Sequence, residues 1–163
     1  MKSQAKLINL DGSSDQFYRY KMPCAEVHRE GGRMVFANVL DVCKAIGRPP
    51  EYLTKYLGYT FACSVTCSKE GDRAFLPSSV RAEAVAASVV SFVEETVLCA
   101  TCRNPETTVV LEGVKKKRVV FLSCLGCGAR TPLPSEKRIV KLMMERTPSL
   151  SAASSSSSSS SLR

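Results

Sequence analysis

Four cysteines constrain this chain more than any other feature of its sequence. They form two C-x-x-C pairs with 21 residues between the pairs: Cys99, Cys102, Cys124 and Cys127. Each pair can turn two thiolates toward one ion, and two such turns complete a tetrahedron. Strand-like sequence at 107–111 and 118–123 lies between the pairs, as a ribbon hairpin requires. The pattern predicts one structural Zn²⁺ bound by all four thiolates, with buried or redox-active cysteines as the alternative.

The remainder of the sequence is consistent with reduced thiols. Residues 1–6 lack the apolar stretch of a secretory signal, and no apolar run approaches the roughly 20 residues of a membrane span. We therefore expect a cytoplasmic chain without a membrane partner, in which cysteines bind metal rather than form disulfides. The other four cysteines show no second paired spacing, and we interpret them as core or surface thiols: Cys24, Cys43, Cys63 and Cys67.

Positive charge is concentrated in one segment of the chain. The formal net charge is +8, and residues 97–146 hold 10 basic against 4 acidic residues, a net +6. The densest part, called here the basic run, consists of Lys115, Lys116, Lys117 and Arg118. A basic face on a small module is typical of a nucleic-acid-binding protein. A solvated hairpin tip is the alternative interpretation of the same run.

Periodicity and turn residues divide the chain into four parts. We expect a flexible arm over 1–16, a small mixed α/β domain over 17–96, a zinc ribbon with a C-terminal helix over 97–146, and a disordered serine-rich tail over 147–163. The predicted fold class is therefore α+β. Asn38 is the expected N-cap of the first helix, Gly47 its C-terminal cap, and Gly126 and Gly128 are expected to supply positive φ at the second cysteine turn.

Individual elements follow from the same patterns. Helices are expected at 39–46, from 50 to about 57, from Ser78 or Ser79 to about 95, and at about 135–146. Strands are expected at 24–28, 33–37, 59–66, 74–76, 107–111 and 118–123.

The most unusual string of the sequence surrounds one arginine. Arg19 stands among three aromatic residues, Phe17, Tyr18 and Tyr20, within the string DQFYRYKMP at 15–23. The aromatic rings can anchor an arm while Arg19 projects as a planar cation toward phosphate, as an arginine finger does in a GTPase. A structural strand in which Arg19 forms a salt bridge or a cation–π contact explains the same residues. The string by itself leaves both interpretations open.

The same string resembles the N-terminal region of the eukaryotic translation initiation factor 5 family. The resemblance covers about residues 14–145, including segments at 38–42, 48–52, 97–99 and 104–107 and the four paired cysteines. The related beta subunit of initiation factor 2 is similar in the ribbon and in the preceding module, but it lacks the string around Arg19. The resemblance implies a first module similar in fold to initiation factor 1.

The resemblance also implies a function. It implies a factor that activates GTP hydrolysis by initiation factor 2, which carries GTP and initiator tRNA on the small ribosomal subunit, at start-codon recognition. Arg19 matches the family's arginine finger, and Arg33 and Lys55 match two further basic positions important for activity. Such a chain is not itself an enzyme, because the hydrolytic chemistry belongs to the partner. The basic run would contact ribosomal RNA or initiator tRNA, and other initiation factors are further expected partners.

The chain departs from the family in several respects, among them the shortened glycine-rich loop before Arg33 and the stretch after Gly58. It contains no G-x-x-x-x-G-K-[ST] P-loop, so we do not expect it to bind GTP by itself, although GTP binding is a family-level term. Family members continue into a helical-repeat domain, whereas this sequence ends in a serine tail, as a fragment or a shortened form would. The alternatives are a non-catalytic ribosome- or tRNA-binding module and a structural subunit like the beta subunit of initiation factor 2.

Overall fold

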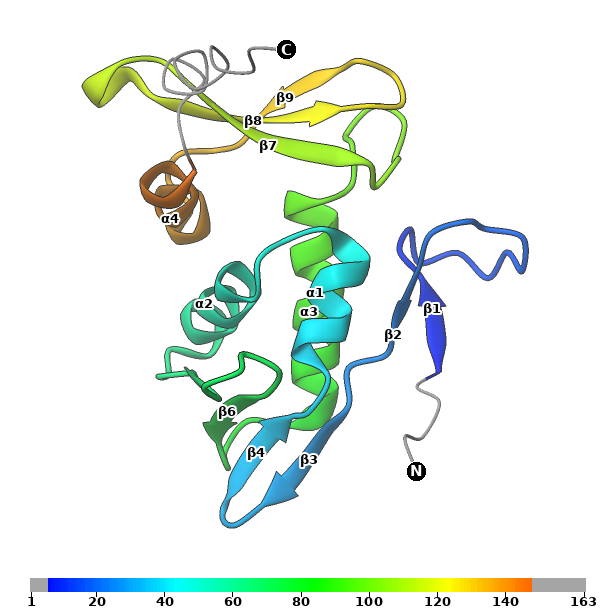
Figure 1. Ribbon diagram of the computed structural model, residues 1–163, viewed down its shortest axis with the longest axis vertical. Coiled ribbons are helices and arrows are strands. Elements are labelled where there is room, and N and C mark those ends of the chain that lie inside the picture. The colour runs from blue at the N-terminus through cyan, green and yellow to red at the C-terminus, as the bar shows by residue number, and fades with distance from the viewer. Residues whose placement is uncertain (1–5, 148–163) are drawn as a thin grey trace, which may run out of the picture. The chain divides into compact units, whose positions relative to one another are not determined.

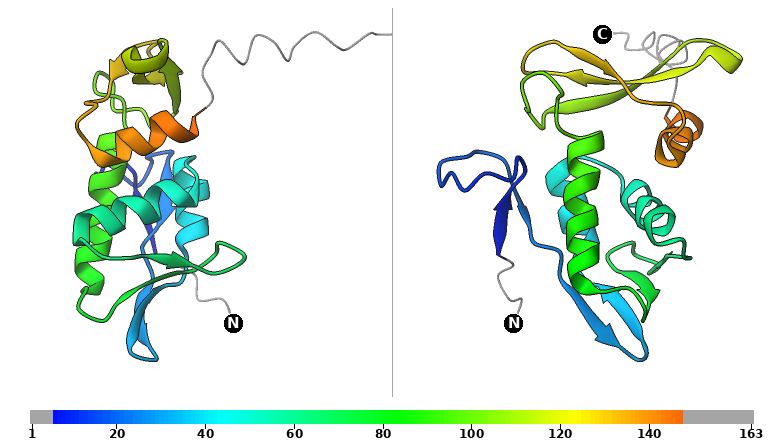
Figure 2. Two further views of the ribbon diagram at one scale, coloured as in Figure 1. Left: turned by 90° about the vertical axis from the view of Figure 1, so that its left-hand side faces the viewer. Right: turned by 180° about the vertical axis from the view of Figure 1, so that it is seen from behind.

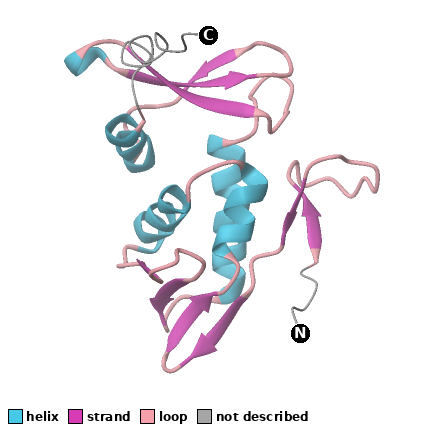
Figure 3. Ribbon diagram, viewed as in Figure 1, coloured by secondary structure: helices cyan, strands magenta, loops and turns pink. Residues whose placement is uncertain are grey.

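The computed structural model describes residues 6–147, and these form two compact units that meet in sequence between Leu98 and Cys99. Figure 1 labels the helices and strands, and Figure 3 colours them by type. The mixture of helices and antiparallel sheets, with four clustered cysteines in the second unit, confirms the predicted α+β class. None of the helices in the described part of the chain is long and apolar enough to cross a membrane.

The first unit combines a two-stranded and a four-stranded antiparallel sheet with three helices. The small sheet pairs β1 (Leu7–Asn9) with β2 (Lys21–Pro23). The larger sheet has the order β3-β4-β6-β5, formed by β3 (Val27–Glu30), β4 (Arg33–Phe36), β6 (Ala74–Pro77) and β5 (Thr66–Cys67). The helices are α1 (Val39–Ile46), α2 (Pro50–Phe61) and α3 (Ala82–Thr96).

Apolar side chains at helical spacing form the core of this unit. Four apolar positions at helical spacing in α3 are all buried: Val85, Val89, Phe92 and Val93. From the sheet, Phe36 and Leu76 are almost completely buried, and Leu53 and Leu57 of α2 join them. The strands expected at 24–28 and 33–37 occur at 27–30 and 33–36 and pair as a hairpin, and the helix over 39–46 and its left-handed cap at Gly47 (φ 67°) are present as expected.

Two local expectations for this unit are wrong, and a third is only partly right. Residues 59–61 belong to α2 rather than to a strand, because Phe61 continues the four-residue repeat of Leu53 and Leu57; the helix ends at Ala62, which adopts positive φ (50°). Helix α3 begins at Ala82, since the residues after Pro77 form a turn instead. Asn38 is the N-cap residue of α1, as expected, but its side chain does not form a capping hydrogen bond.

The side chain of Asn38 instead connects the start of α1 to the segment that follows β2. Its Nδ2 donates to the carbonyl oxygen of Cys24 (2.8 Å), and its Oδ1 accepts from the backbone N–H of Glu26 (2.8 Å). Asn38 is buried, and buried polar groups are normally satisfied by such hydrogen bonds. The long-range partners therefore override the local capping preference.

The predicted flexible arm is also partly wrong. Residues 7–9 form β1, which pairs in antiparallel register with β2, and Leu10 is buried. The apolar surface that Ile8 and Leu10 bury helps to order this segment, although the sequence on both sides is polar. The serine-rich tail predicted over 147–163 lies, apart from its first residue, outside the described residues.

Arg48 joins the end of α1 to the end of α3. Its Nε and one terminal nitrogen donate to the carbonyl oxygen of Thr96 (3.2 and 2.8 Å), and the other terminal nitrogen donates to that of Gly47 (3.1 Å). Burial lowers the pKa of Arg48 to about 10, so the guanidinium remains charged at neutral pH. A cation at this place complements the C-terminal end of a helix dipole.

Replacing Arg48 with methionine is expected to lower the free energy of unfolding of the first unit by about 2–3 kcal/mol. The variant leaves the carbonyl oxygen of the buried Thr96 without its charged donor, and hydrogen bonds to a charged group contribute about 1.5–3 kcal/mol. Urea unfolding followed by circular dichroism measures the change. Arg48→Lys is expected to recover part of the loss, because an ammonium group lacks the planar fork. An unchanged unfolding midpoint for Arg48→Met would contradict this role.

The second unit is a three-stranded antiparallel sheet with a helix. Strands β7 (Thr107–Glu112), β8 (Val119–Cys124) and β9 (Arg130–Pro132) lie in this order, and α4 (Arg138–Arg146) packs against β8. The two strands between the cysteine pairs and the C-terminal helix agree with the elements expected from the sequence. One face of the sheet and one face of α4 are buried, through Leu111, Val120, Leu122, Ile139, Leu142 and Met143.

Candidate functional site

The four paired cysteines come together at one end of the ribbon. Their sulfur atoms all lie within 4.8 Å of one another, with Cys99 Sγ 3.7 Å from Cys127 Sγ and Cys102 Sγ 3.5 Å from Cys124 Sγ. A tetrahedral ion with metal–sulfur bonds of about 2.3 Å places its ligands about 3.8 Å apart. The four sulfurs therefore fit around one metal ion.

Both cysteine turns have the same backbone design. The N–H of Arg103 donates to the carbonyl oxygen of Cys99 (2.9 Å), and the N–H of Gly128 donates to that of Cys124 (3.1 Å). The donor residue has positive φ in each turn, 61° at Arg103 and 75° at Gly128. Gly128 thus has the conformation expected from the sequence, whereas Gly126 is not among the glycines with positive φ.

Gly126 lies where the two cysteine turns approach each other. A Cβ at this position would lie 2.6 Å from Nδ2 of Asn104, which belongs to the first cysteine turn. The Oδ1 of Asn104 accepts from the backbone N–H of Glu106 (2.8 Å), so the amide is not free to move away without losing this bond. The two turns therefore approach each other closely here, and a larger residue at position 126 would displace the Asn104 amide.

Backbone N–H groups stabilise the thiolate form of one of the four cysteines. The backbone N–H groups of Cys102 and Thr101 lower the pKa of Cys99 to about 6, so this residue is a thiolate at neutral pH. The backbone N–H of Asn104 acts in the same direction on Cys102, but burial and the neighbouring thiols outweigh it and raise the pKa of Cys102 to about 12. A metal ion must therefore displace protons from the cluster, which makes its affinity depend on pH.

The other cysteines are not part of a metal site. In the described residues the metal-competent group is the four-cysteine cluster alone. Cys43 is buried, and burial, with a smaller contribution from Cys67, raises its pKa to about 12. Cys67 is exposed, and Cys24 and Cys63 are half-buried. These four residues are thus core or surface thiols, as interpreted from the sequence.

The basic run forms an exposed turn at the tip of the β7–β8 hairpin. Residues Lys115–Lys117 make a short 3₁₀ helix, and Nε of Arg118 donates to the carbonyl oxygen of Lys115 (3.0 Å). The turn is tight at Gly113, where φ is 100° and a Cβ would lie 2.1 Å from the carbonyl oxygen of Lys117. Within residues 6–147, no carboxylate forms an ion pair with the four cations.

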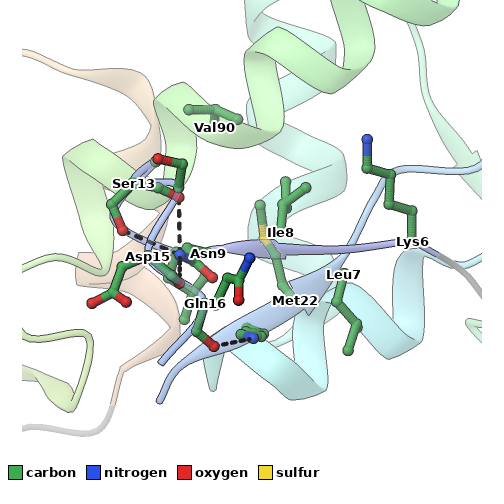
Figure 4. Close-up of a pocket in the computed structure, with 13 residues that line it drawn as sticks. Lys6, Leu7, Ile8, Asn9, Ser13, Asp15, Gln16, Met22 and Val90 are labelled. Carbon is green, nitrogen blue, oxygen red and sulfur yellow. Dashed lines mark hydrogen bonds between the residues drawn. The ribbon is translucent and has the colours of Figure 1, made fainter. Parts of the chain in front are cut away.

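Arg19 lies in the segment that joins β1 to β2, called here the Arg19 loop (residues 10–20). Asn9 holds this loop together, because its Nδ2 donates to the carbonyl oxygens of Ser13 (2.9 Å) and Asp15 (2.7 Å). Figure 4 shows these bonds beside a cavity of about 550 Å³ that the loop forms with β1, β2 and Val90. The carboxylate of Asp15 accepts from the backbone N–H of Phe17 (2.9 Å), and Nζ of Lys21 donates to the carbonyl oxygen of Gln16 (3.1 Å).

The aromatic residues around Arg19 differ in their surroundings. Tyr18 and Tyr20 are half-buried and meet edge to face, with ring centroids 6.0 Å apart. Arg19 is exposed, and its guanidinium carbon lies 5.8 Å from the centre of the Tyr20 ring. The cation–π contact considered from the sequence is therefore present, whereas no ion pair of Arg19 occurs among the residues that the structure describes. Phe17 is 93% exposed and does not anchor the loop to its own chain.

The structure does not bring Arg19 and Arg33 together. Arg33 begins β4 beside the β3–β4 turn, where its guanidinium covers the ring of Phe75 at 5.3 Å. This turn and the Arg19 loop lie at opposite ends of the first unit in Figures 1 and 2. Lys55 is an exposed residue of α2. The three basic positions therefore belong to different parts of the surface.

Sequence reasoning missed the role of Asn9 in shaping the Arg19 loop. The available signal was the polar sequence that follows it, Asp11-Gly12-Ser13, because asparagine and aspartate side chains near glycine typically bond to the backbone of turns. The exposure of Phe17 had no comparable signal, since its aromatic neighbours Tyr18 and Tyr20 are partly covered.

Comparison with known proteins identifies relatives over most of the chain. Residues 11–130 match the model of a family described as a domain found in initiation factors 2B and 5. Eukaryotic translation initiation factor 5 of Mus musculus is 35% identical over 149 residues, which cover 88% of this chain and 34% of that protein. The Saccharomyces cerevisiae protein of the same name is 31% identical over 145 residues, covering 86% of this chain and 35% of that protein.

The similarity therefore covers only one part of these larger proteins. This chain spans about a third of the length of the curated relatives it matches. The matched family region contains both the Arg19 loop and the four-cysteine cluster. The chain belongs to the family of the domain found in initiation factors 2B and 5, and within it to the translation initiation factors of the factor 5 type, whose N-terminal region it resembles.

Proposed function

We propose that this chain stimulates GTP hydrolysis by initiation factor 2, in the complex of that factor with initiator tRNA on the small ribosomal subunit, at start-codon recognition. Arg19 enters the nucleotide site of the partner and stabilises the charge that develops on the transferred phosphoryl group. The chain contributes this side chain in trans and carries out no hydrolysis alone. The site of action is the cytoplasm, and other initiation factors of the complex are further partners.

The observation that carries this proposal is an exposed guanidinium on an ordered loop. Arg19 is exposed, has no ion-pair partner within residues 6–147, and follows a segment fixed by the hydrogen bonds of Asn9 and Asp15. An arginine finger needs this combination, because the cation must leave its own protein and still arrive in one geometry. Similarity to proteins named as initiation factor 5 supports the choice of the GTPase.

The test is GTP hydrolysis in a reconstituted complex of initiation factor 2, initiator tRNA and the small subunit. Single-turnover rates are compared with and without this chain. Stimulation that requires Arg19 supports the proposal, and equal rates in both cases contradict it. The chain alone with GTP is the matched control, and it is expected to show no hydrolysis because it contains no P-loop.

We assign Arg33 and Lys55 to supporting roles. Arg33 begins β4 beside the β3–β4 turn, which lies at the opposite end of the first unit from the Arg19 loop in Figures 1 and 2, so contact with RNA suits it better than assistance at the same phosphate. Lys55 is exposed on α2 and is equally suited to a phosphate of RNA. Tyr18 and Tyr20 support the backbone on either side of Arg19 through their edge-to-face contact.

We further propose that the metal of the four-cysteine cluster is Zn²⁺. Thiolate ligands in a tetrahedron favour zinc over the hard cations, which prefer oxygen. All four positions would be filled by cysteine, so the ion has a structural role and offers no open position for substrate. Within this chain the ion would hold the two cysteine turns together at one end of the sheet.

The basic run favours RNA binding as a second function of the same chain. Four exposed cations stand on a tight turn without acidic partners in the described residues. Such a turn can follow a phosphate backbone whether or not Arg19 acts in catalysis. In the purely RNA-binding alternative, Arg19 would affect affinity and leave the rate of hydrolysis unchanged.

Replacing Lys115, Lys116 and Lys117 together with alanine is expected to weaken binding to small-subunit RNA about 10- to 100-fold at low salt. Each lost phosphate contact also reduces the slope of log affinity against log salt by about 0.7–0.9. Fluorescence anisotropy over a salt series measures both quantities. Lys69→Ala removes an exposed lysine from the first unit and serves as the control. An unchanged slope would indicate that the run is a solvated hairpin tip.

A further inference from the structure

Phe17 has an environment unlike that of any other phenylalanine in the chain. The sequence has six phenylalanines, and all of them lie in the described residues. Phe36 and Phe92 are completely buried, and Phe61, Phe75 and Phe121 are partly covered. Phe17 is 93% exposed. An exposed aromatic ring gains none of the stabilisation that burial normally gives such a residue. Phe17 therefore has no packing role within its own chain.

The backbone that carries Phe17 is nevertheless fixed. Its N–H donates to the carboxylate of Asp15 (2.9 Å), and the next N–H, that of Tyr18, donates to the carbonyl oxygen of Asp15 (3.3 Å). The carbonyl oxygen of Asp15 also accepts from Asn9 (2.7 Å), as Figure 4 shows. The loop is thus ordered before any partner binds, which reduces the entropy lost on docking.

We propose that Phe17 is the residue by which the Arg19 loop docks on the GTPase: its ring enters an apolar pocket at the rim of the nucleotide site and thereby positions Arg19. This inference rests on the proposed function. Positions 17 and 19 are at most about 7 Å apart along the chain. An arginine finger at position 19 therefore brings the ring at position 17 against the same partner. Exposed aromatic side chains of this kind are the residues that dominate binding at protein interfaces.

The charges of the loop favour a protein partner over RNA. Asp11 and Asp15 precede Phe17 within the same loop, and their carboxylates would be repelled by a phosphate backbone. The alternative, a ring stacked on an RNA base, uses segments in which cations surround the aromatic residue. Around Phe17 the two carboxylates come before the ring and the cations Arg19 and Lys21 follow it, so cations do not surround it on both sides. Phe17 therefore acts in docking rather than as a catalytic residue.

The first test separates docking from chemistry. In the reconstituted complex, the rate of GTP hydrolysis is measured against the concentration of this chain. Phe17→Ala is expected to raise the half-saturating concentration about 10- to 100-fold, with a much smaller effect on the rate at saturation. Arg19→Ala is expected to lower the saturated rate instead. Phe17→Leu, which keeps an apolar side chain, is expected to recover most of the half-saturating concentration.

Leu7→Ala is the matched control, because Leu7 is also an exposed apolar residue (58%) and lies on the strand before the loop. It is expected to behave like the wild type. If Phe17→Ala also behaves like the wild type while Arg19→Ala is slow, the docking role is wrong and the arginine finger stands. If Arg19→Ala retains the full rate, the proposed function itself is wrong.

A second test does not depend on activity. A photoreactive p-benzoyl-phenylalanine at position 17 is irradiated in the same complex, with the same residue at position 7 as the control. Cross-linking from position 17 to the GTP-binding polypeptide, above the level from position 7, supports docking. Cross-linking to ribosomal RNA or tRNA, or none above the control, overturns it.

Discussion

Arg19→Ala is expected to slow GTP hydrolysis in the reconstituted initiation complex by about 10²–10⁴-fold, since an arginine finger contributes about 10³–10⁵ to the rate. The guanidinium is exposed and its ring contact is with Tyr20, at 5.8 Å. Its removal therefore leaves the fold intact, and an unchanged circular dichroism spectrum should accompany the loss. Single-turnover release of phosphate at a saturating concentration of this chain measures the rate.

Two variants separate the role of the finger from a general effect of charge. Arg19→Lys keeps the charge but lacks the planar fork, so it is expected to recover little of the rate. Arg33→Ala removes a cation beside the β3–β4 turn, which lies at the opposite end of the first unit from the Arg19 loop, and it is expected to reduce the saturated rate far less. A lysine variant with the wild-type rate would indicate electrostatic attraction rather than transition-state stabilisation by a guanidinium.

The elements predicted best from the sequence are those whose pattern is purely local. Helix α1 has apolar residues at 39, 42, 43 and 46 and a glycine directly after them, and the structure reproduces its bounds and its cap. The cysteine cluster is equally local within each pair, because a C-x-x-C turn fixes two sulfurs at once. Spacing alone could therefore indicate the metal site, although it could not indicate the approach of Asn104 to Gly126.

The features that the sequence could not predict depend on contacts between distant residues. Asn38 has the residue type of an N-cap, but its side chain forms hydrogen bonds with Cys24 and Glu26, which are 14 and 12 residues away along the chain. The Arg19 loop is ordered by Asn9 and by the pairing of β1 with β2, whereas local composition suggested a flexible arm. The separation of Arg19 from Arg33 is likewise a property of the assembled unit.

Removing the metal is expected to unfold the second unit while the first unit keeps its structure. Described residues of the second unit run from 99 to 147, and folds of this size rarely bury enough apolar surface to be stable without a metal or disulfides. A structural zinc contributes about 10–16 kcal/mol of apparent binding energy at neutral pH. Heteronuclear NMR after chelation should lose the dispersed amide signals of β7, β8 and β9 and keep those of α1 and α3.

Cys124→Ser is expected to give the same result without a chelator, and Cys67→Ser, which replaces an exposed thiol outside the cluster, is the control. Acid should also release the metal, since protons compete for the four thiolates as the pH falls. Restoring Zn²⁺ at neutral pH should refold the wild type and the Cys67→Ser variant but not Cys124→Ser. Retention of the sheet signals in metal-free protein would contradict this prediction. It would show that the core around Leu111, Val120 and Met143 is enough to fold the second unit, and that the ion has a role other than folding.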